Sequence, residues 1–484
     1  MNEQHQQQHQ HFIGGAWVAA SSGVTLPVID PATGAAFGQI QRGNAADVDR
    51  AVAAARAAMN GEWGRSTATE RGRILHRMSQ LILAGHEQLS QLEALDTGKP
   101  IGQARNDITV AARYFEYYAG AADKLHGEQI PYLNDFHVVV LREPYGVTAH
   151  ILPWNYPAQM FGRSVVGALA AGNAAVLKPS EDACLTPLAL CRIAQAAGLP
   201  AGALNVVTGL GEEAGDALTH HHDIDYISFT GSPEVGTLVQ KAAAERTLKC
   251  VLELGGKSPH VVFDDADLER AAGFVLKAIT QNAGQTCSAG SRLLVQRGVH
   301  DRFVAMVAER FAHSAAGTPA MDRDCGPLIN AKQQRRVLGY IERARAAGIP
   351  VLAQGRIAEG VPAGGYYVPP TLFGAVPRGH ELACEEVFGP VLAVLPFDDE
   401  ADAIALANAT DYGLIAAIWT ADGGRQTRLA KAMQCGQVYL NCYGAGGGVE
   451  LPFGGVKRSG HGREKGFMAL EEFTNVKTVV QYHG

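Results

Sequence analysis

The sequence lacks a long apolar run and an excess of basic charge. Its longest apolar stretch, residues 165–177, is interrupted by Gly167, Gly172 and Asn173 and is shorter than the ~20 residues that a membrane helix needs. The 41 Lys and Arg residues are outnumbered by 48 Asp and Glu residues, which gives a formal charge of −7. A nucleic-acid-binding surface and a polybasic membrane surface are therefore not expected. The partner that remains is a small molecule.

The eight cysteines lack the close spacing of a metal site. The shortest separation, between Cys184 and Cys191 and again between Cys435 and Cys442, is seven residues, whereas zinc knuckles use C-x-x-C pairs. We therefore expect no metal. A chain of 484 residues buries a core without disulfides, and its first residues show no signal-peptide pattern. We expect reduced thiols and a cytoplasmic protein.

What the sequence does contain is a regular alternation of strand-period and helix-period segments, typical of α/β layering around a mostly parallel sheet. Four successive β-α units together have the size of a dinucleotide-binding domain. They place strands at 147–152, 174–178, 204–207 and 226–229 and helices at 163–171, 187–198, 213–219 and 233–244. A second series of strands, from 260–263 to 438–441, predicts a second α/β domain.

Three segments stand outside this alternation. Residues 127–144 alternate apolar and polar side chains near their end and predict a hairpin-like excursion. The last strand-like segment, 476–481, has no obvious neighbour, so we expect it to pair with that excursion or with another subunit. Residues 1–11 have almost no apolar content and are predicted to form a disordered tail.

Two glycine-containing turns connect a predicted strand to a predicted helix. Residues 209–214 match the G-x-G-x-x-A dinucleotide pattern, but a tight turn needs glycine whether or not a nucleotide binds. In the next unit, Gly231 and Ser232 are followed by Pro233 at the first helical turn. Such a helix start presents free N–H groups and a positive dipole end, which suit a pyrophosphate. We favour this second turn as the phosphate site.

Two residues have the surroundings of catalytic groups. Glu253 lies between two leucines and is followed by Gly255 and Gly256, so its carboxyl is expected to have a raised pKa and to act as a general base. Cys287 lies further on, in a small polar loop between a helix and a strand. Of the eight cysteines, it is the one that we expect to be exposed and reactive.

Seven short motifs, in their order and spacing, resemble the aldehyde dehydrogenase superfamily from about residue 12 to the C-terminus. They are Pro153-Trp154-Asn155, Lys178-Pro179-Ser180-Glu181, Phe229-Thr230-Gly231-Ser232, Glu253-Leu254-Gly255-Gly256-Lys257, Gly284-Gln285-Thr286-Cys287, Glu386-Val387-Phe388-Gly389-Pro390 and Pro452-Phe453-Gly454-Gly455-Val456-Lys457.

The resemblance implies an α/β fold with a Rossmann-like cofactor domain, an α/β catalytic domain and a small β oligomerisation flap. We place the cofactor domain at 12–123 and 145–253, the catalytic domain at 254–455, and the flap at 124–144 and 456–484. Exposed strands need a partner to cover their edge, so a homodimer or homotetramer is expected.

The resemblance also implies the chemistry. Cys287 looks like the nucleophile that attacks an aldehyde carbonyl, and the Asn155 side-chain amide and the Cys287 backbone N–H would hold the oxyanion of the thiohemiacetal. Hydride transfer to a nicotinamide would leave a thioester. Glu253 would activate the water that hydrolyses this thioester to a free carboxylic acid.

The resemblance assigns a further set of residues to the cofactor. They are Ile151, Leu152, Pro153, Trp154, Lys178, Ser180, Glu181, Gly211, Phe229, Gly231, Ser232, Leu254, Glu386 and Phe388. A carboxylate at Glu181 accepts hydrogen bonds from a ribose hydroxyl pair but repels a 2′-phosphate, so NAD is the expected cofactor. Lys178 nearby softens this preference and leaves NADP open.

The sequence leaves two kinds of aldehyde substrate open. Arg163 resembles the carboxylate-binding arginine of succinic semialdehyde dehydrogenases, and its guanidinium would pair with a carboxylate at the far end of the substrate. Alternatively, Arg163 bridges to a neighbouring acid as an ordinary helix-face arginine. Tyr156, with Phe161, Tyr443 and Phe453, would instead line a tunnel for an aromatic or aliphatic aldehyde.

Two other classes of function are compatible with part of the pattern. A thiol hydrolase or esterase would use Cys287 and Glu253 but would have no use for a nucleotide turn. A non-catalytic NAD-binding protein would tolerate the loss of Cys287. The presence of Asn155, Glu253 and Cys287 together argues against both.

Overall fold

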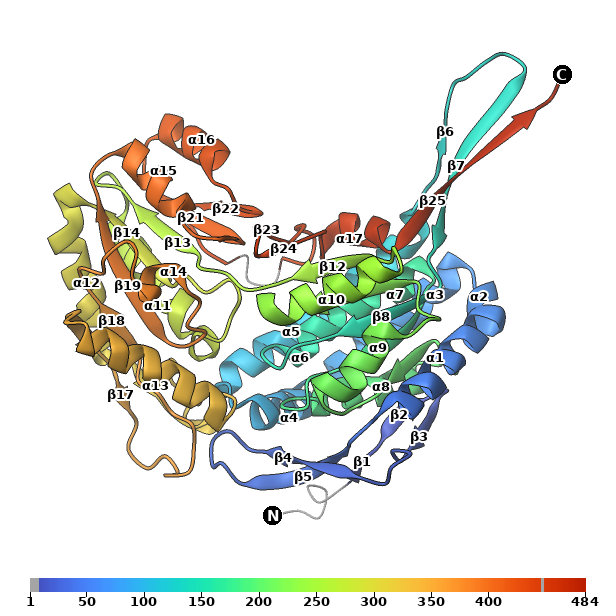
Figure 1. Cartoon of the computed structure of the whole chain (residues 1–484), viewed down its shortest axis with the longest axis horizontal. Helices are drawn as coiled ribbons and strands as arrows, with labels where there is room; N and C mark the ends of the chain where they lie inside the picture. The colour runs from blue at the N-terminus through green and yellow to red at the C-terminus, as the bar shows by residue number, and fades with distance from the viewer. Residues whose placement is uncertain (1–7, 445–447) are drawn as a thin grey trace.

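A long mixed sheet organises the first half of the fold. The computed structural model of the chain describes residues 8–444 and 448–484, and its first large sheet has the strand order β3-β2-β10-β9-β8-β11-β12-β24 (Figure 1). The five strands from β10 to β12 are parallel and almost fully buried, which explains their nearly continuous apolar sequences. The bounds are β2 (His11–Ile13), β3 (Ala16–Val18), β8 (Val147–Ile151), β9 (Ala174–Lys178), β10 (Leu204–Val206), β11 (Tyr226–Thr230), β12 (Lys249–Glu253) and β24 (Gly460–His461).

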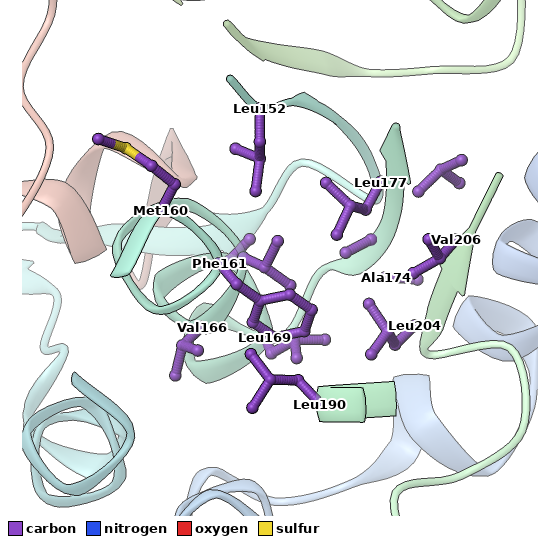
Figure 2. Close-up of a cluster of buried hydrophobic side chains, with 14 of the residues drawn as sticks. Leu152, Met160, Phe161, Val166, Leu169, Ala174, Leu177, Leu190, Leu204 and Val206 are labelled. Atoms are coloured by element: carbon purple, nitrogen blue, oxygen red, sulfur yellow. The ribbon is translucent and has the colours of Figure 1, made fainter. Parts of the chain in front are cut away.

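Amphipathic helices pack against this sheet. In the first of them, the Asn44 side chain caps the helix by accepting from the Ala46 and Asp47 backbone N–H groups, and its apolar face is buried against β8, β9 and β10. Figure 2 shows the same kind of packing around Phe161 and Leu169, which lie close to Leu190. The helices of this half are α1 (Ala45–Asn60), α2 (Glu62–Arg65), α3 (Ala68–Ala84), α4 (His86–Thr97), α5 (Ile101–Ala121), α6 (Pro157–Met160), α7 (Val166–Ala171), α8 (Leu185–Ala196), α9 (Asp216–His220) and α10 (Pro233–Glu245).

A second α/β layer follows in the chain, as predicted. Its sheet has seven strands in the order β16-β18-β19-β14-β13-β21-β22, and two apolar clusters fill its two faces. The strands are β13 (Pro259–Val262), β14 (Arg292–Gln296), β16 (Val351–Gln354), β18 (Thr371–Phe373), β19 (Val391–Phe397), β21 (Ile415–Trp419) and β22 (Gln437–Leu440). The helices are α11 (Leu268–Thr280), α12 (His300–His313), α13 (Ala331–Ala346), α14 (Glu381–Cys384), α15 (Glu400–Asn408) and α16 (Gly423–Ala432). Helix α17 (Gly466–Glu472) comes later in the chain but packs against α7 of the first half.

The excursion near residue 140 and the end of the chain form one antiparallel flap. Strand β7 (Phe136–Pro144) pairs with β25 (Thr474–Tyr482) along its whole length, from Pro144 opposite Thr474 to Phe136 opposite Tyr482. The short strand β6 (Glu128–Gln129) pairs with the other edge of β7. Figure 1 shows this flap projecting from the body of the molecule with the C-terminus near its tip. The predicted pairing of the last strand with the excursion is therefore confirmed.

The predicted disordered tail is wrong for residues 8–11. Strand β1 (Gln8–His9) pairs in parallel with β5 (Ala36–Gln41), which in turn pairs with β4 (Thr25–Ile29). His11 begins β2 and is fully buried, where its Nδ1 accepts a hydrogen bond of 3.2 Å from the Thr208 N–H. Strand pairing satisfies the backbone whatever the polarity of the side chains, so a polar composition was a poor guide here. Residues 1–7 lie outside the described residues.

The remaining strands are short. They are β15 (Ala315–Ala316), β17 (Arg356–Ile357), β20 (Tyr412–Gly413) and β23 (Val456–Lys457). None of the helices in the described part of the chain has both the length and the apolar character to cross a bilayer.

Candidate active site

The predicted site residues follow the carboxyl ends of neighbouring parallel strands. The chain winds outward through β9 and β10 on one side of β8 and returns through β11 and β12 on its other side. At such a reversal the connections leave the sheet in opposite directions, which opens a crevice beyond the strand ends. Asn155 follows β8, Gly231 and Ser232 follow β11, and Glu253 is the last residue of β12.

A cavity of about 530 Å³ lies in this region and extends to residues of the second α/β layer, among them Gln333 of α13 and Phe388. Nine residues of the predicted site line it: Pro153, Trp154, Asn155, Gly231, Ser232, Glu253, Cys287, Glu386 and Phe388. The predicted catalytic trio and the favoured phosphate turn thus meet in one cavity, although they come from separate parts of the sequence.

Other predicted cofactor residues lie outside the lining of this cavity. They are Ile151, Leu152, Lys178, Ser180, Glu181, Gly211, Phe229 and Leu254. Lys178 ends β9, and its Nζ is 2.7 Å from Glu181 Oε2. Gly211 opens the turn before α9, and a Cβ on it would meet nothing within 4 Å. Leu254 packs closely against Gly236 of α10: a Cβ on Gly236 would lie only 2.5 Å from Cδ2 of Leu254.

An unusual turn presents Cys287 to the cavity. Asn282, Ala283 and Gly284 all have positive φ angles, of 48°, 54° and 73°. Gly284 is required there, because a Cβ would lie 2.2 Å from the carbonyl oxygen of Gly389. Burial raises the pKa of the Cys287 thiol to about 12, while the Arg163 cation acts in the opposite direction. The thiol therefore needs a base before it can act as a nucleophile.

Asn155 is held beside this turn by a buried network. The side-chain Nδ2 of Asn155 donates to the backbone carbonyl oxygen of Gln285 at 3.0 Å. The backbone carbonyl oxygen of Asn155 accepts from Asn282 Nδ2 at 2.9 Å and from Lys99 Nζ at 3.0 Å. Lys99 is fully buried, and its ammonium also contacts Asp107 at 2.5 Å and Glu93 at 3.2 Å. The side-chain amide of Asn155 is thus held against Gln285, which lies two residues before Cys287 in the chain.

Sequence reasoning did not identify Lys99 as part of this arrangement. It follows the glycine that ends α4, and no local pattern distinguishes a buried lysine from an exposed one at a helix end. Residues at the start of α13 were missed for a similar reason. Gln333 Nε2 donates to the Phe388 carbonyl oxygen at 2.7 Å, and Arg336 donates to the Glu386 carbonyl oxygen at 2.7 Å. These bonds fix the segment that carries Glu386 and Phe388.

Arg163 bridges two buried carboxylates. Its Nη2 is 3.0 Å from Glu253 Oε2, and its Nε contacts Glu464, so the guanidinium is enclosed on two sides by acids. Its Cζ also lies 4.2 Å from the ring centre of Phe453. Of the two interpretations left open by the sequence, the structure supports a bridging arginine and does not present a free guanidinium to a substrate carboxylate.

The carboxyl of Glu253 binds a proton more readily than that of an exposed glutamate. Burial raises its pKa well above the usual range, and Arg163 opposes this shift. Its Oε1 comes within 2.7 Å of the place that a Cβ on Gly454 would occupy, so glycine is needed where this segment crosses the carboxyl.

Tyr156 supports the Cys287 loop. Its hydroxyl shares a hydrogen bond of 2.8 Å with Thr286 Oγ1.

The cofactor end of the cavity is also built from charged and hydrogen-bonding groups. Ser232 caps α10 by accepting from the Val235 N–H at 3.3 Å, and the N–H of Gly256 donates to Glu386 Oε1 at 2.9 Å. Burial raises the pKa of Glu386 to about 7. The ring of Trp154 meets that of Phe388 edge-on at 5.4 Å. In the ranges 8–444 and 448–484, no three or more His, Cys, Asp and Glu side chains are grouped so as to bind a metal ion.

Comparisons with known proteins agree with this geometry. The sequence model of the aldehyde dehydrogenase family matches residues 17–479. A crystal structure of a Burkholderia cenocepacia protein assigned to the aldehyde dehydrogenases is 57% identical, with a TM-score of 0.97 over 98% of this chain and 100% of that chain. An aldehyde dehydrogenase from Bacillus cereus in complex with NAD+ is 39% identical, with a TM-score of 0.96 over 98% and 97%. Betaine aldehyde dehydrogenase from Staphylococcus aureus with NAD+ is 35% identical, with a TM-score of 0.95 over 98% and 95%.

Proposed function

Because the chain belongs to the aldehyde dehydrogenase family, we propose that it oxidises an aldehyde to the carboxylic acid with NAD+ through a thioester on Cys287. The observation that supports this most directly is the cavity in which Asn155, Glu253 and Cys287 meet the capped start of α10. The NAD+ complexes of the Bacillus cereus and Staphylococcus aureus relatives support the choice of cofactor.

The residues present fit a dinucleotide. The N-terminus of α10 directs the positive end of its helix dipole towards the turn at Gly231, and a Cβ on that glycine would lie 2.6 Å from the ring of Phe229. Lys178, the last residue of β9, and Glu181, three residues further on, would bind the ribose hydroxyls. Glu386 and Phe388 line the cavity towards Cys287, where a nicotinamide ribose would lie. When bound, NAD+ accepts a hydride from the substrate carbon.

Glu253, Cys287 and Asn155 carry out the other steps of the proposed reaction. Glu253, directly or through a water, takes the thiol proton of Cys287, and the thiolate adds to the aldehyde carbonyl. The Asn155 amide and the Cys287 backbone N–H stabilise the resulting oxyanion. After the hydride has left, the carbon carries a thioester. Glu253 then releases the thiol proton to solvent, and its carboxylate removes a proton from the attacking water. Cleavage of the C–S bond releases the acid and returns the thiol.

The experiment that tests this proposal measures NADH and acid formation by the purified protein with butanal and NAD+. Equal amounts of both products are expected, together with a higher melting temperature in NAD+. Hydrolysis of an ester without any NADH formation from aldehydes would instead assign the protein to the thiol hydrolases.

Replacing Glu253 by glutamine is expected to give a burst of NADH close to one per active site, slower than in the wild type because water must then take the thiol proton. A steady-state rate about 10²–10⁴-fold slower than that of the wild type should follow. The amide keeps the shape of the side chain but cannot accept the proton of water, so the thioester accumulates. Stopped-flow NADH absorbance measures both phases. A steady-state rate equal to that of the wild type would show that another base activates the water.

We also propose that Glu181 selects NAD+ over NADP+. Its carboxylate would repel a 2′-phosphate, although Lys178, 2.7 Å away, offsets part of that repulsion. Glu181→Ser is therefore expected to raise the ratio of kcat/KM for NADP+ to that for NAD+ by about tenfold. Glu245→Ser, an exposed acid at the end of α10, serves as the control. An unchanged ratio in the Glu181 variant would remove this residue from the ribose site.

We also propose that the flap forms part of an interface between subunits. It exposes apolar side chains that a second copy of the chain would cover in a homodimer or homotetramer. These side chains are Ile130, Tyr132, Leu133, Val476, Val480 and Tyr482.

A further inference from the structure

A buried lysine beside the catalytic residues has no role in the chemistry described above. Lys465 immediately precedes α17 and follows Glu464, the carboxylate that Arg163 contacts. Only 8% of its surface is exposed, which is rare for a lysine without an ion pair. Within residues 8–444 and 448–484, no hydrogen bond or ion pair involves its ammonium.

The acids around Lys465 already have partners. Glu450 pairs with Arg113, and Glu253 and Glu464 both contact Arg163. Burial lowers the pKa of Lys465 to about 8; Arg163 also lowers it, while Cys287, Glu450 and Glu253 raise it. The ammonium therefore keeps its charge at neutral pH without a dedicated counter-ion.

Lys465 lies beside an aromatic ring of the cluster against which Cys287 packs. Its Nζ is 5.5 Å from the ring centre of Phe453, the same ring that Arg163 contacts. Phe453 and Tyr443 belong to the apolar cluster against which Cys287 packs. Phe453, Tyr443 and Lys465 are not among the residues that line the cavity reaching the Ser232 turn.

The backbone at Lys465 is strained in a way that fits a built site. Its φ and ψ angles are 66° and 163°, a region that only glycine adopts readily. A side chain in this region is strained, and the surrounding structure must offset that strain.

On this basis we propose that Lys465 binds an anionic group of the substrate, so that the preferred aldehyde carries a carboxylate at the end remote from its aldehyde carbon. This inference rests on the proposed oxidation of an aldehyde at Cys287. It moves the anion-binding role that the sequence suggested for Arg163 to a neighbouring cation that has no acid partner. A charge-assisted hydrogen bond in a poorly hydrated site gives such selectivity.

The test compares succinic semialdehyde with butanal, which differ chiefly in the terminal carboxylate. We expect the wild type to prefer succinic semialdehyde, and Lys465→Met to lower the ratio of the two kcat/KM values by at least about tenfold, mainly through KM. Lys465→Arg should restore most of the ratio. Lys465→Gly removes the cation and also relieves the backbone strain, so it should show the same loss of selectivity through a different structural perturbation. Lys431→Met, an exposed lysine on α16, is the control.

The two readouts separate this inference from the proposed function. NADH formation from butanal by the wild type reports on the oxidation alone. If butanal is oxidised but the wild type shows no preference for the semialdehyde, or if both the Met and Gly variants keep the preference, Lys465 is not the anion-binding group. If neither aldehyde yields NADH, the oxidation itself is wrong and the inference falls with it.

Discussion

Replacing Cys287 by alanine is expected to reduce NADH formation from aldehydes by at least about 10⁴-fold, because no thiol remains to form the thioester. The side chain is half-buried, so its truncation removes little packing. NAD+ should still raise the melting temperature of the variant, since Cys287 contributes little to the cofactor end of the cavity. The measurements are initial rates with butanal and thermal unfolding with and without NAD+.

Cys384→Ala provides the matched control for this prediction. Cys384 is also half-buried, but it lies on α14 and donates a weak hydrogen bond to the Arg378 carbonyl oxygen at 3.4 Å. Its replacement should leave the rate within about twofold of the wild type. Turnover by Cys287→Ala at more than a few per cent of the wild-type rate would mean that another group attacks the aldehyde.

The second large effect is expected at Lys99, whose replacement by methionine should lower the free energy of unfolding by about 3–5 kcal/mol. Its ammonium neutralises two buried carboxylates, Glu93 and Asp107, and also holds the carbonyl oxygen of Asn155. The variant keeps the length of the side chain but leaves those acids without a cation. Because Asn155 loses an anchor, kcat should fall as well, while the melting temperature reports the stability.

The pH dependence distinguishes this cause from a simple packing defect. Burial raises the pKa of Asp107 to about 6 even with Lys99 present, and Lys99 acts to lower it. Without the cation, the folded state favours the protonated acid still more, so the stability of Lys99→Met should increase as the pH falls. Adding Asp107→Asn to Lys99→Met should recover part of the lost stability at neutral pH. A pH-independent loss would indicate packing as the cause.

The sequence is a good guide where one local pattern determines the structure. The segments 147–152 and 226–229 are rich in apolar and β-branched residues, and they lie in the sheet within one residue of their predicted ends. Pro233 behind Ser232 predicted a helix start, which the structure has as the capped N-terminus of α10. The division of the chain into domains at residue 253 stays a prediction.

The sequence is a poor guide where long-range contacts determine the environment of a charge. Arg163 was read either as a substrate anchor or as a bridge, because the acids that decide between them are 90 and 301 positions away, at Glu253 and Glu464. Lys99 and Lys465 gave no signal at all, since burial of a lysine depends on segments that are distant in the chain. The polar residues 8–11 entered a sheet because a partner strand was available.

The pairing of β7 with β25 also sets an order of events during synthesis. About 330 residues separate Pro144 from its partner Thr474, so at 5–20 residues per second a ribosome needs on the order of half a minute to supply the second strand. Until then β7 is paired only along part of one edge, by the short strand β6 and the Ile130 N–H that follows it. His137, Arg142 and Glu143 interrupt its apolar sequence, and such charged and polar positions protect a waiting edge from pairing with other nascent chains.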